Sequence, residues 1–88
     1  MEIRRNKHYK KDALKVKLTD EQYTKRIKYL FFIFHGRDLP SEARDHSLMG
    51  EYKGSREFHL GGDVLLIYRV ADEMLYLQRL GTHSQLFK

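Results

Sequence analysis

The hydrophobic pattern of this chain changes once, at a break over residues 36 to about 44 that contains the single proline, Pro40. Before the break, apolar residues recur at helical spacing, whereas beyond residue 50 they form short runs that are typical of strands. Strands that follow helices along a chain favour an α+β fold. With 88 residues and no cysteine, the chain is expected to form one small domain, residues 1–88, without disulfides.

Two helices are predicted before the break. Asn6 is placed to cap a first helix that reaches about Lys17. Thr19, followed three residues later by Gln22, has the capping-box pattern that opens a second helix over residues 20–35. Together these signals predict two helices in the N-terminal half.

The second helix carries one apolar stripe at helical spacing. The stripe consists of Tyr23, Ile27, Leu30, Phe31 and Phe34. Three basic residues, Lys25, Arg26 and Lys28, lie off this stripe. We therefore expect that their charges can be reversed without unfolding the domain.

Three consecutive strands are predicted after the break. Residues 55–60 are strand-like and end at the tight turn Gly61-Gly62. Residues 64–70 form a continuous apolar run, as expected for a central strand that is buried on both faces, and residues 74–80 form the next strand. Short links between the three favour an antiparallel meander. Residues 2–5 are a candidate short first strand.

The net charge of +5 is concentrated in the first third of the chain. Residues 1–30 contain ten Lys or Arg against four Asp or Glu, whereas the rest of the chain has seven against eight. This asymmetry favours nucleic acid as a partner, followed by a highly acidic protein, over an ordinary solvated helix face. The candidate RNA-facing residues are Lys10, Lys11, Lys15, Lys17, Lys25, Arg26 and Lys28.

Residues able to cleave RNA without a metal gather in the second half. Such cleavage needs a base for the ribose 2′-hydroxyl, an acid for the departing 5′-oxygen, and positive charge at the phosphate. Histidine exchanges protons near neutral pH, and arginine supplies permanent charge. The candidates for proton transfer are His46, His59, Asp63 and His83, and those for charge are Arg79 and, less directly, Arg56.

The predicted meander brings most of these candidates to one rim of the sheet. The Gly61-Gly62 turn lies between His59 and Asp63. Arg79 and His83 flank the end of the third strand, which in a meander lies beside the start of the second. His46 comes from the loop before the sheet, and the pattern does not place it.

Each candidate also has an ordinary structural interpretation. Asp63 could cap the turn, Arg79 could pair with Glu57 across strands, and a loop histidine is usually only solvated. Three histidines and an aspartate could in principle bind zinc. The sequence has no His-x-x-x-His or Glu-x-x-His spacing, so we expect neither a metal nor another cofactor.

The chain carries no apolar run of about 18 residues and opens without an apolar signal region. A cytoplasmic location without membrane association is therefore expected.

Several strings between Leu39 and Phe87 resemble the RelE/YafQ family of bacterial type II toxins, and the YafQ branch most closely. They occur in order and at near-constant spacing over a little over half of the chain. The strings are Leu39-Pro40, Asp45-His46-Ser47-Leu48-Met49-Gly50, Tyr52-Lys53-Gly54-Ser55-Arg56-Glu57-Phe58-His59, Asp63-Val64-Leu65-Leu66-Ile67-Tyr68 and Arg79-Leu80-Gly81-Thr82-His83-Ser84-Gln85-Leu86-Phe87. The chain departs from the family at Ser47, where proline is common, and at Val64, where some relatives have an aromatic residue.

The resemblance implies a microbial-ribonuclease-like, RelE-like toxin fold, with two N-terminal helices packed on a small twisted antiparallel sheet. It implies ribosome-dependent, metal-independent endonucleolytic cleavage of mRNA in the decoding site. It also implies a cognate antitoxin that neutralises the toxin, with operator DNA bound only through that antitoxin. By position, the family's active-site set corresponds to His46, His59, Asp63, Arg79, His83 and, for substrate binding, Phe87. The main alternative is a basic nucleic-acid-binding or regulatory module that does not cleave.

Overall fold

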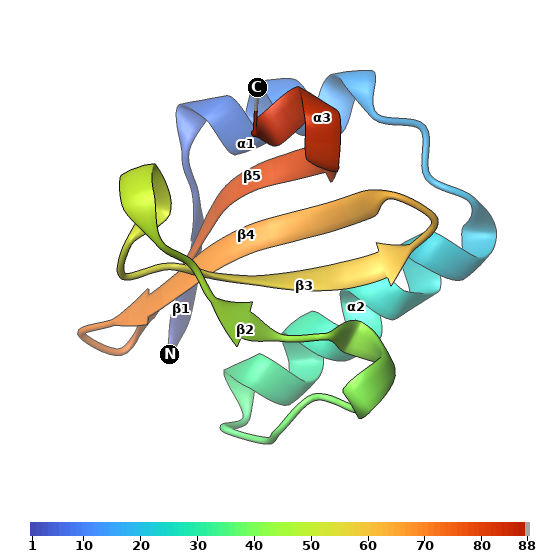
Figure 1. Cartoon of the computed structure of the whole chain (residues 1–88). Coiled ribbons are helices and arrows are strands. Elements are labelled where there is room, and N and C mark those ends of the chain that lie inside the picture. Colours follow the sequence, from blue (N-terminus) through green and yellow to red (C-terminus); the bar gives the residue numbers. More distant parts are fainter. Residues whose placement is uncertain (88) are drawn as a thin grey trace.

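The computed structural model describes residues 1–87 and has an α+β architecture (Figure 1). Within these residues, five strands form one sheet in the order β1-β5-β4-β3-β2. The strands are β1 (Glu2–Arg5), β2 (His46–Ser47), β3 (Arg56–Gly61), β4 (Val64–Ala71) and β5 (Met74–Thr82). The helices are α1 (Lys7–Lys15), α2 (Asp20–Phe34) and α3 (His83–Leu86), with short 3-10 turns at Ser41–Ala43 and Gly50–Tyr52. No helix in the described part of the chain is both long and apolar enough to cross a bilayer.

The predicted meander of three antiparallel strands is confirmed as β3, β4 and β5. The prediction of an antiparallel sheet is wrong for its edge, because β1 runs parallel to β5 and makes the sheet mixed. The candidate first strand at residues 2–5 is confirmed as β1. The placement of the helices at the N-terminus is corrected, since a strand precedes α1 and a third helix, α3, follows β5. All four residues of β1 are exposed, so hydrophobic alternation gave no signal for its partner or direction.

Both predicted helix starts are confirmed. The Asn6 side chain accepts a hydrogen bond from the backbone N–H of Tyr9 at 2.8 Å. Thr19 and Gln22 form the reciprocal capping box that opens α2. Helix α1 ends at Lys15, two residues before the predicted end. α2 ends at Phe34, and Gly36 follows with φ +67°, in the left-handed region that favours glycine.

The face of α2 that packs on the sheet is not the predicted apolar stripe. Tyr29 and Ile33 are the buried residues of this helix. Tyr23, Ile27 and Phe31 of the stripe are each more than half exposed. The C-terminal half of α2 is apolar on every side, so the spacing of apolar residues fits two faces equally well.

The two faces of the sheet differ in what covers them. Helices α1 and α2 lie behind one face and bury the larger core, which includes Tyr9, Tyr29, Phe58, Leu66 and Leu77 (Figure 1). The other face carries a smaller cluster of Leu65, Ile67 and Leu86, against which Leu48, Tyr52 and Phe87 pack. Polar residues of β2, β3 and β5 adjoin this smaller cluster, and they form the candidate site.

The buried Tyr68 gives the fold a measurable dependence on alkaline pH. Its hydroxyl donates to Asp45 Oδ1 at 2.6 Å, and burial, followed by this carboxylate, raises the pKa of Tyr68 well above its ordinary value. In the unfolded chain the phenol ionises near pH 10, while the folded chain keeps its proton. The folded state then holds more protons, so the free energy of unfolding should fall above about pH 10, by up to about 1.4 kcal/mol per pH unit from this group.

Urea unfolding of the wild type and of Tyr68→Phe between about pH 8 and pH 12 tests this expectation. The variant should be less stable at neutral pH by about 1 kcal/mol, because the Asp45 carboxylate loses a donor. It should also lose stability less steeply above about pH 10. If the free energy of unfolding fell equally steeply with pH in the two proteins, the alkaline loss of stability would not come from Tyr68.

Candidate active site

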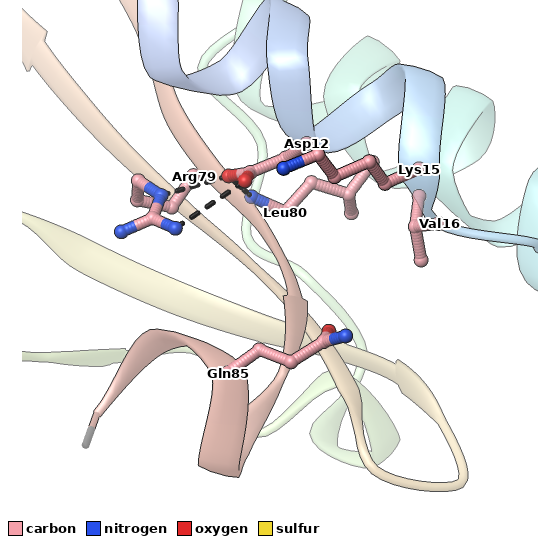
Figure 2. Close-up of a pocket in the computed structure, with 6 residues that line it drawn as sticks. All are labelled: Asp12, Lys15, Val16, Arg79, Leu80 and Gln85. Atoms are coloured by element: carbon pink, nitrogen blue, oxygen red, sulfur yellow. Dashed lines mark hydrogen bonds and ion pairs between the residues drawn. The ribbon is translucent and has the colours of Figure 1, made fainter.

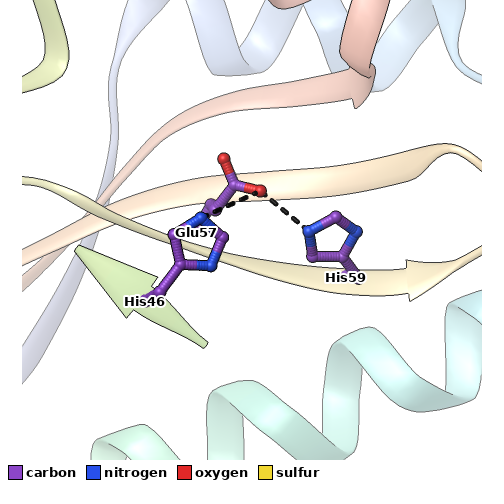
Figure 3. Close-up of side chains that lie close together, drawn as sticks. All are labelled: His46, Glu57 and His59. Carbon is purple, nitrogen blue, oxygen red and sulfur yellow. Dashed lines mark ion pairs between the residues drawn. The ribbon is translucent and has the colours of Figure 1, made fainter. Parts of the chain in front are cut away.

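His46, Glu57 and His59 form a compact group on the open face of the sheet (Figure 3). In the register of β2 and β3, His46 lies opposite Glu57, and His59 follows two residues later on the same face of β3. The Glu57 carboxylate lies 2.8 Å from His59 Nε2 and 3.8 Å from His46 Nε2. The two imidazole rings are stacked, with centroids 6.2 Å apart.

The loop before β2 fixes the orientation of His46. His46 Nδ1 lies 2.6 Å from the carbonyl oxygen of Arg44, and a carbonyl can only accept, so Nδ1 carries a hydrogen. In the neutral ring, Nε2 then has the free lone pair and is able to accept a proton. Asp45 holds this loop to the sheet, because its Oδ1 accepts from both Tyr68 and Arg56.

Glu57 is a member of the site that the sequence analysis did not include. Only 3% of it is exposed, yet it lies between two imidazoles rather than in a salt bridge with arginine. The sequence offered one signal, a glutamate two residues before His59, where alternation puts both side chains on one face. The interpretation that Arg79 pairs with Glu57 across strands is wrong, because Arg79 has a different carboxylate partner.

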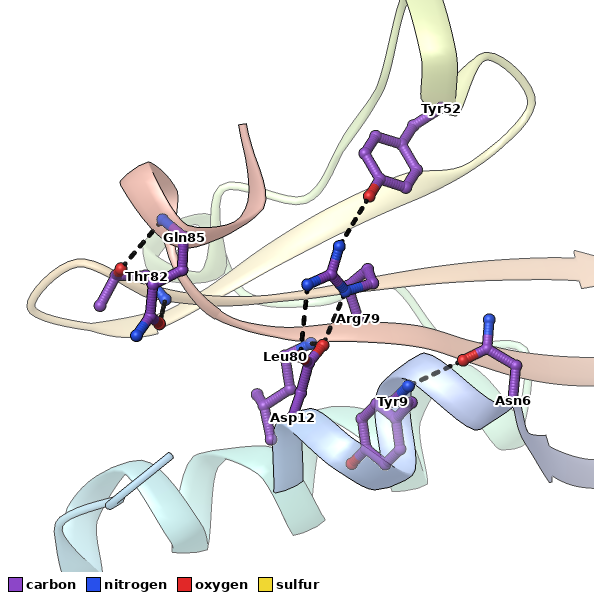
Figure 4. A network of polar contacts seen from close by, with 8 residues as sticks. All are labelled: Asn6, Tyr9, Asp12, Tyr52, Arg79, Leu80, Thr82 and Gln85. Carbon is purple, nitrogen blue, oxygen red and sulfur yellow. Dashed lines mark hydrogen bonds and ion pairs between the residues drawn. The ribbon is translucent and has the colours of Figure 1, made fainter. Parts of the chain in front are cut away.

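Arg79 is the centre of a second polar group (Figure 4). Its Nε and Nη2 donate to the two oxygens of Asp12 at 2.8 and 3.3 Å, and its Nη1 donates to the Tyr52 hydroxyl at 3.3 Å. These hydrogen bonds, with that to Asp12 the strongest, raise the pKa of Arg79 above its ordinary value, so the guanidinium remains charged. The contacts use three of its five N–H donors, which leaves one on each terminal nitrogen for a phosphate.

Asp12 of α1 is the second residue that sequence reasoning missed. Its carboxylate also accepts from the backbone N–H of Leu80 at 3.0 Å, so one side chain holds both α1 and Arg79 against β5. A bulge makes this possible, because Gln78 has no partner in β4 while Arg79 pairs with Ile67 and Leu77 pairs with Tyr68. Bulges of this kind re-aim side chains and are frequent beside active sites.

His83 and Phe87 extend the second group at the C-terminal end. The rings of His83 and Phe87 lie 4.8 Å apart between centroids, and Phe87 meets Tyr52 edge-on at 5.6 Å. His83 is the first residue of α3, whose start is capped by Thr82. Gly81 precedes this start, and a Cβ there would lie 2.8 Å from the Gln85 side chain, so glycine allows the close approach.

Asp63 joins the site through the backbone. Its carbonyl accepts from the N–H of His83 at 3.1 Å, which brings the β3–β4 turn beside the start of α3. Among residues 1–87, no hydrogen bond or ion pair joins the Asp63 carboxylate to His59. Of the four candidates predicted for one rim, His59 therefore lies in the first group, beside His46, whereas Arg79 and His83 lie in the second group, which Asp63 joins through its backbone.

The two groups lie on either side of β4. Glu57 pairs in register with Ile67, which pairs with Arg79, so all three lie in one row across the sheet. Two strand spacings put the Glu57 and Arg79 backbones about 10 Å apart, enough for a phosphodiester between their side chains.

Cavities border the Arg79 side of this row. One cavity of about 230 Å³ is lined by Asp12, Lys15, Val16, Arg79, Leu80 and Gln85 (Figure 2). A second, of about 480 Å³, shares Arg79 and Gln85 and is also lined by Tyr52 and Phe87. A third cavity, of about 340 Å³, is lined by Arg79 with Asn6, His8, Glu51, Tyr52 and Gln78, so Arg79 borders three hollows of the surface.

The remaining candidates belong to neither group, although Lys15 lines a cavity beside Arg79. Arg56 is exposed and donates to Asp45, so its visible contact anchors the loop before His46. Lys10, Lys11, Lys15 and Lys17 are all exposed on or just after α1. Lys28 is exposed, but Lys25 and Arg26 are partly buried, which corrects the expectation that they lie clear of the packed face.

The first group has donors that fit a metal ion. One ligand atom from each of His46, Glu57 and His59 lies within 4.8 Å of the other two. Two imidazoles and a carboxylate are a set that zinc and other transition metals accept. The expectation that no metal takes part therefore stays a prediction, to be tested by chelation.

Comparisons with known proteins identify one family, and its model matches the whole chain. The family described as "Bacterial toxin of type II toxin-antitoxin system, YafQ" matches residues 1–88. The mRNA interferase toxin YafQ of Escherichia coli (strain K12) is 39% identical over 83 residues, which cover 90% of this chain and 87% of that protein.

Solved structures of similar proteins have the same fold. A copper-bound mutant toxin from Helicobacter pylori superposes with a TM-score of 0.85 at 32% identity, covering 98% of both chains. The E. coli DinJ-YafQ complex contains a chain with a TM-score of 0.77 at 32% identity, covering 98% of this chain and 97% of that chain. A metal-bound toxin from H. pylori has a TM-score of 0.79 at 32% identity, covering 97% of both chains.

Proposed function

Because this chain belongs to the YafQ family of bacterial type II toxins, whose E. coli members are mRNA interferases, we propose that it cleaves mRNA in the ribosomal decoding site by metal-independent acid–base catalysis. The observation that carries the proposal is the pair of histidines bridged by buried Glu57, in the same row of the sheet as the charged Arg79 with one strand between them.

In this mechanism the 2′-hydroxyl of the RNA attacks the adjacent phosphorus. The histidine pair accepts the hydroxyl proton, and the free lone pair of His46 Nε2 supports that role. The new 2′-O–P bond forms as the P–O5′ bond breaks, and His83 on the far side donates a proton to the leaving 5′-oxygen. The products are a 2′,3′-cyclic phosphate and a 5′-hydroxyl.

Arg79 stabilises the charge that develops on the phosphate. Its two remaining N–H donors match two phosphate oxygens, and its contacts with Asp12 and Tyr52 hold the guanidinium in place before the substrate arrives. Asp12 and Glu57 are positioning residues, because each acts through the side chain that it holds. Phe87 and Tyr52 offer aromatic surfaces on which an RNA base can stack.

The partners proposed for this chain are an antitoxin, operator DNA and ribosomal RNA. The E. coli relative was crystallised with DinJ as a toxin–antitoxin complex, and a cognate antitoxin is proposed for this chain too. Operator DNA would be bound through that antitoxin. The exposed lysines of α1 are proposed to contact ribosomal RNA through its phosphates, which attract any polycation without regard to sequence.

The test is cleavage of one message, free and bound to the ribosome, by purified protein. We expect cleavage of bound mRNA and little cleavage of free RNA, because the ribosome would hold the 2′-oxygen in line with the leaving group. The ends should carry a 2′,3′-cyclic phosphate or a 3′-phosphate. Equal rates on free and bound message would contradict ribosome dependence.

A metal-dependent mechanism is the second candidate, favoured by the donor set of His46, Glu57 and His59. It predicts that a chelator abolishes cleavage and that the ends carry a 3′-hydroxyl, since a metal activates water instead of the 2′-hydroxyl. The acid–base mechanism predicts that cleavage survives EDTA in a reaction whose ribosomes are kept intact by added magnesium.

The exposed lysines on and just after α1 should govern ribosome affinity. Reversing Lys10, Lys11 and Lys17 to glutamate removes exposed charges without touching Lys15, which borders the Arg79 cavity. We expect weaker association and a salt dependence whose log–log slope flattens by roughly one per lost phosphate contact.

The matched control reverses Arg37, Lys53 and Arg69, which are exposed elsewhere and give the same change in net charge. Titrations over a range of salt concentrations compare the two triple variants. If both weaken binding equally, net charge rather than the α1 surface sets ribosome affinity.

A further inference from the structure

One buried polar atom beside the active site has no hydrogen-bond partner. The Oε1 atom of Gln78 is buried, and within residues 1–87 no group donates a hydrogen bond to it. Leu75 and Leu77 pack in the larger core, so alternation along β5 puts Gln78 on the other face of the sheet, with the candidate site. Buried side-chain acceptors nearly always have a donor, because an unpaired one has lost its hydrogen bonds to water. A donor that arrives with the substrate would pair this oxygen.

The bulge in β5 puts Gln78 next to Arg79 in one cavity. Gln78 is the residue of the bulge without a partner in β4, and both residues line the cavity of about 340 Å³. The residue as a whole is only partly buried. The last torsion of a glutamine side chain has a broad distribution, so the amide can turn its oxygen towards the cavity.

The other residues that line this cavity suit a nucleobase. His8 and Tyr52 supply two rings, and RNA bases stack on histidine and tyrosine. Asn6 uses its Oδ1 to cap α1, and its amide nitrogen has no acceptor within residues 1–87 (Figure 4). Glu51 adds a carboxylate, which in its ionised form only accepts hydrogen bonds. The volume is within the range of about 300–1,000 Å³ that is typical of small-molecule sites.

The cavity lies where a base beside the cleaved bond would reach it. Arg79, the proposed contact of the scissile phosphate, lines this cavity and also the larger one that Phe87 lines. Tyr52 lines both cavities as well, and its hydroxyl accepts from Arg79 Nη1 at 3.3 Å. A phosphodiester joins two nucleosides, so an RNA held at Arg79 has one base to place in each cavity.

We propose that Gln78 is a specificity-determining residue that selects, next to the scissile phosphate, a base with an exocyclic amine. The proposal rests on the proposed function for the position of the phosphate, and it adds which kind of base the site selects. The amine of adenine, cytosine or guanine would donate to Gln78 Oε1 and to the Glu51 carboxylate. Uracil has no amine, so it would leave Gln78 Oε1 unpaired and put a carbonyl oxygen against the Glu51 carboxylate.

The experiment measures single-turnover cleavage of ribosome-bound messages that differ at one nucleotide on either side of the cleaved bond. Each position carries adenosine, cytidine, guanosine, uridine or purine ribonucleoside, which is adenosine without its amine. Gln78→Met removes the amide but keeps an unbranched side chain, whereas Gln78→Glu keeps an acceptor. Tyr76→Phe is the matched control, because Tyr76 lies two residues before Gln78 in β5 and lines none of the three cavities beside Arg79.

At one of the two positions, the wild type and Tyr76→Phe should cleave a message with an amine at least about tenfold faster than those with uridine or purine ribonucleoside. Gln78→Met should bring this ratio close to one by slowing cleavage of the messages with an amine. Gln78→Glu should keep the preference, although its negative charge next to Arg79 should slow cleavage of every message. Gln78→Met should also unfold at a temperature no lower than the wild type, because its side chain leaves no acceptor unpaired.

Equal cleavage of all the messages by the wild type, or an unchanged ratio in Gln78→Met, would overturn the inference alone. A Gln78→Met variant that unfolds well below the wild type would also overturn it, since Gln78 would then have a structural role. Circular dichroism checks folding, and Gln78→Ser replaces Gln78→Met in the cleavage assay if the latter does not fold. A wild type that cleaves none of the messages on the ribosome would overturn the proposed function, and the inference with it.

Discussion

Replacing His83 with alanine should lower cleavage of ribosome-bound mRNA by about 10²- to 10⁴-fold, the range that general acid–base groups contribute. His83 is exposed at the start of α3, where it packs on Phe87 and makes no side-chain contact needed by the core. The substitution should therefore leave the fold intact. Growth arrest by the induced chain should be relieved in parallel, and His59→Ala should have a loss of similar size.

His35→Ala is the control, because His35 is exposed just after α2, outside both polar groups and outside the cavities that Arg79 lines. Single-turnover cleavage assays separate the chemical step from binding to the ribosome. The acid–base role fails if His83→Ala, His59→Ala and Asp63→Ala, each made separately, all cleave and arrest growth like the wild type. In that event the basic, non-cleaving binding module becomes the better account of the chain.

The second large effect is expected at Arg79. Arg79→Lys keeps a positive charge but removes the planar set of donors, so its ammonium cannot hold Asp12, Tyr52 and a phosphate at once. We expect a fall of about 10²- to 10³-fold in the rate of cleavage, comparable with loss of one donor to a developing oxyanion. Asp12→Asn should lower the rate of cleavage by less, because the arginine stays but is held more loosely.

Arg69→Lys is the matched control, since Arg69 is an exposed arginine of β4 away from the cavities beside Arg79. Comparing the cleavage rate of Asp12→Asn with its free energy of unfolding distinguishes loss of positioning from simple destabilisation. Loss of positioning lowers the rate of a folded enzyme, whereas destabilisation lowers the free energy of unfolding. An Arg79→Lys variant that cleaves at the wild-type rate would exclude the guanidinium from transition-state stabilisation.

Local patterns in the sequence were sufficient to predict the helix starts and the meander. A capping box is a contact between residues three apart, so Thr19 and Gln22 carried that information themselves. The buried run of β4, with Gly61-Gly62 before it, required a central strand with short connections. The histidines, Asp63 and Arg79 stood out because such residues, gathered on a basic chain, suit phosphodiester chemistry.

Tertiary structure alone decided the partners of those residues. Asp12 reaches Arg79 across 67 positions of sequence, and Glu57 bridges two histidines from different strands, neither of which any local pattern records. It also decided which face of α2 is buried. Because that helix is apolar nearly all round, only the position of the sheet selected Tyr29 and Ile33 for the core and left Ile27 and Phe31 in water. Periodicity measures how apolar a face is, whereas burial also depends on what lies opposite it.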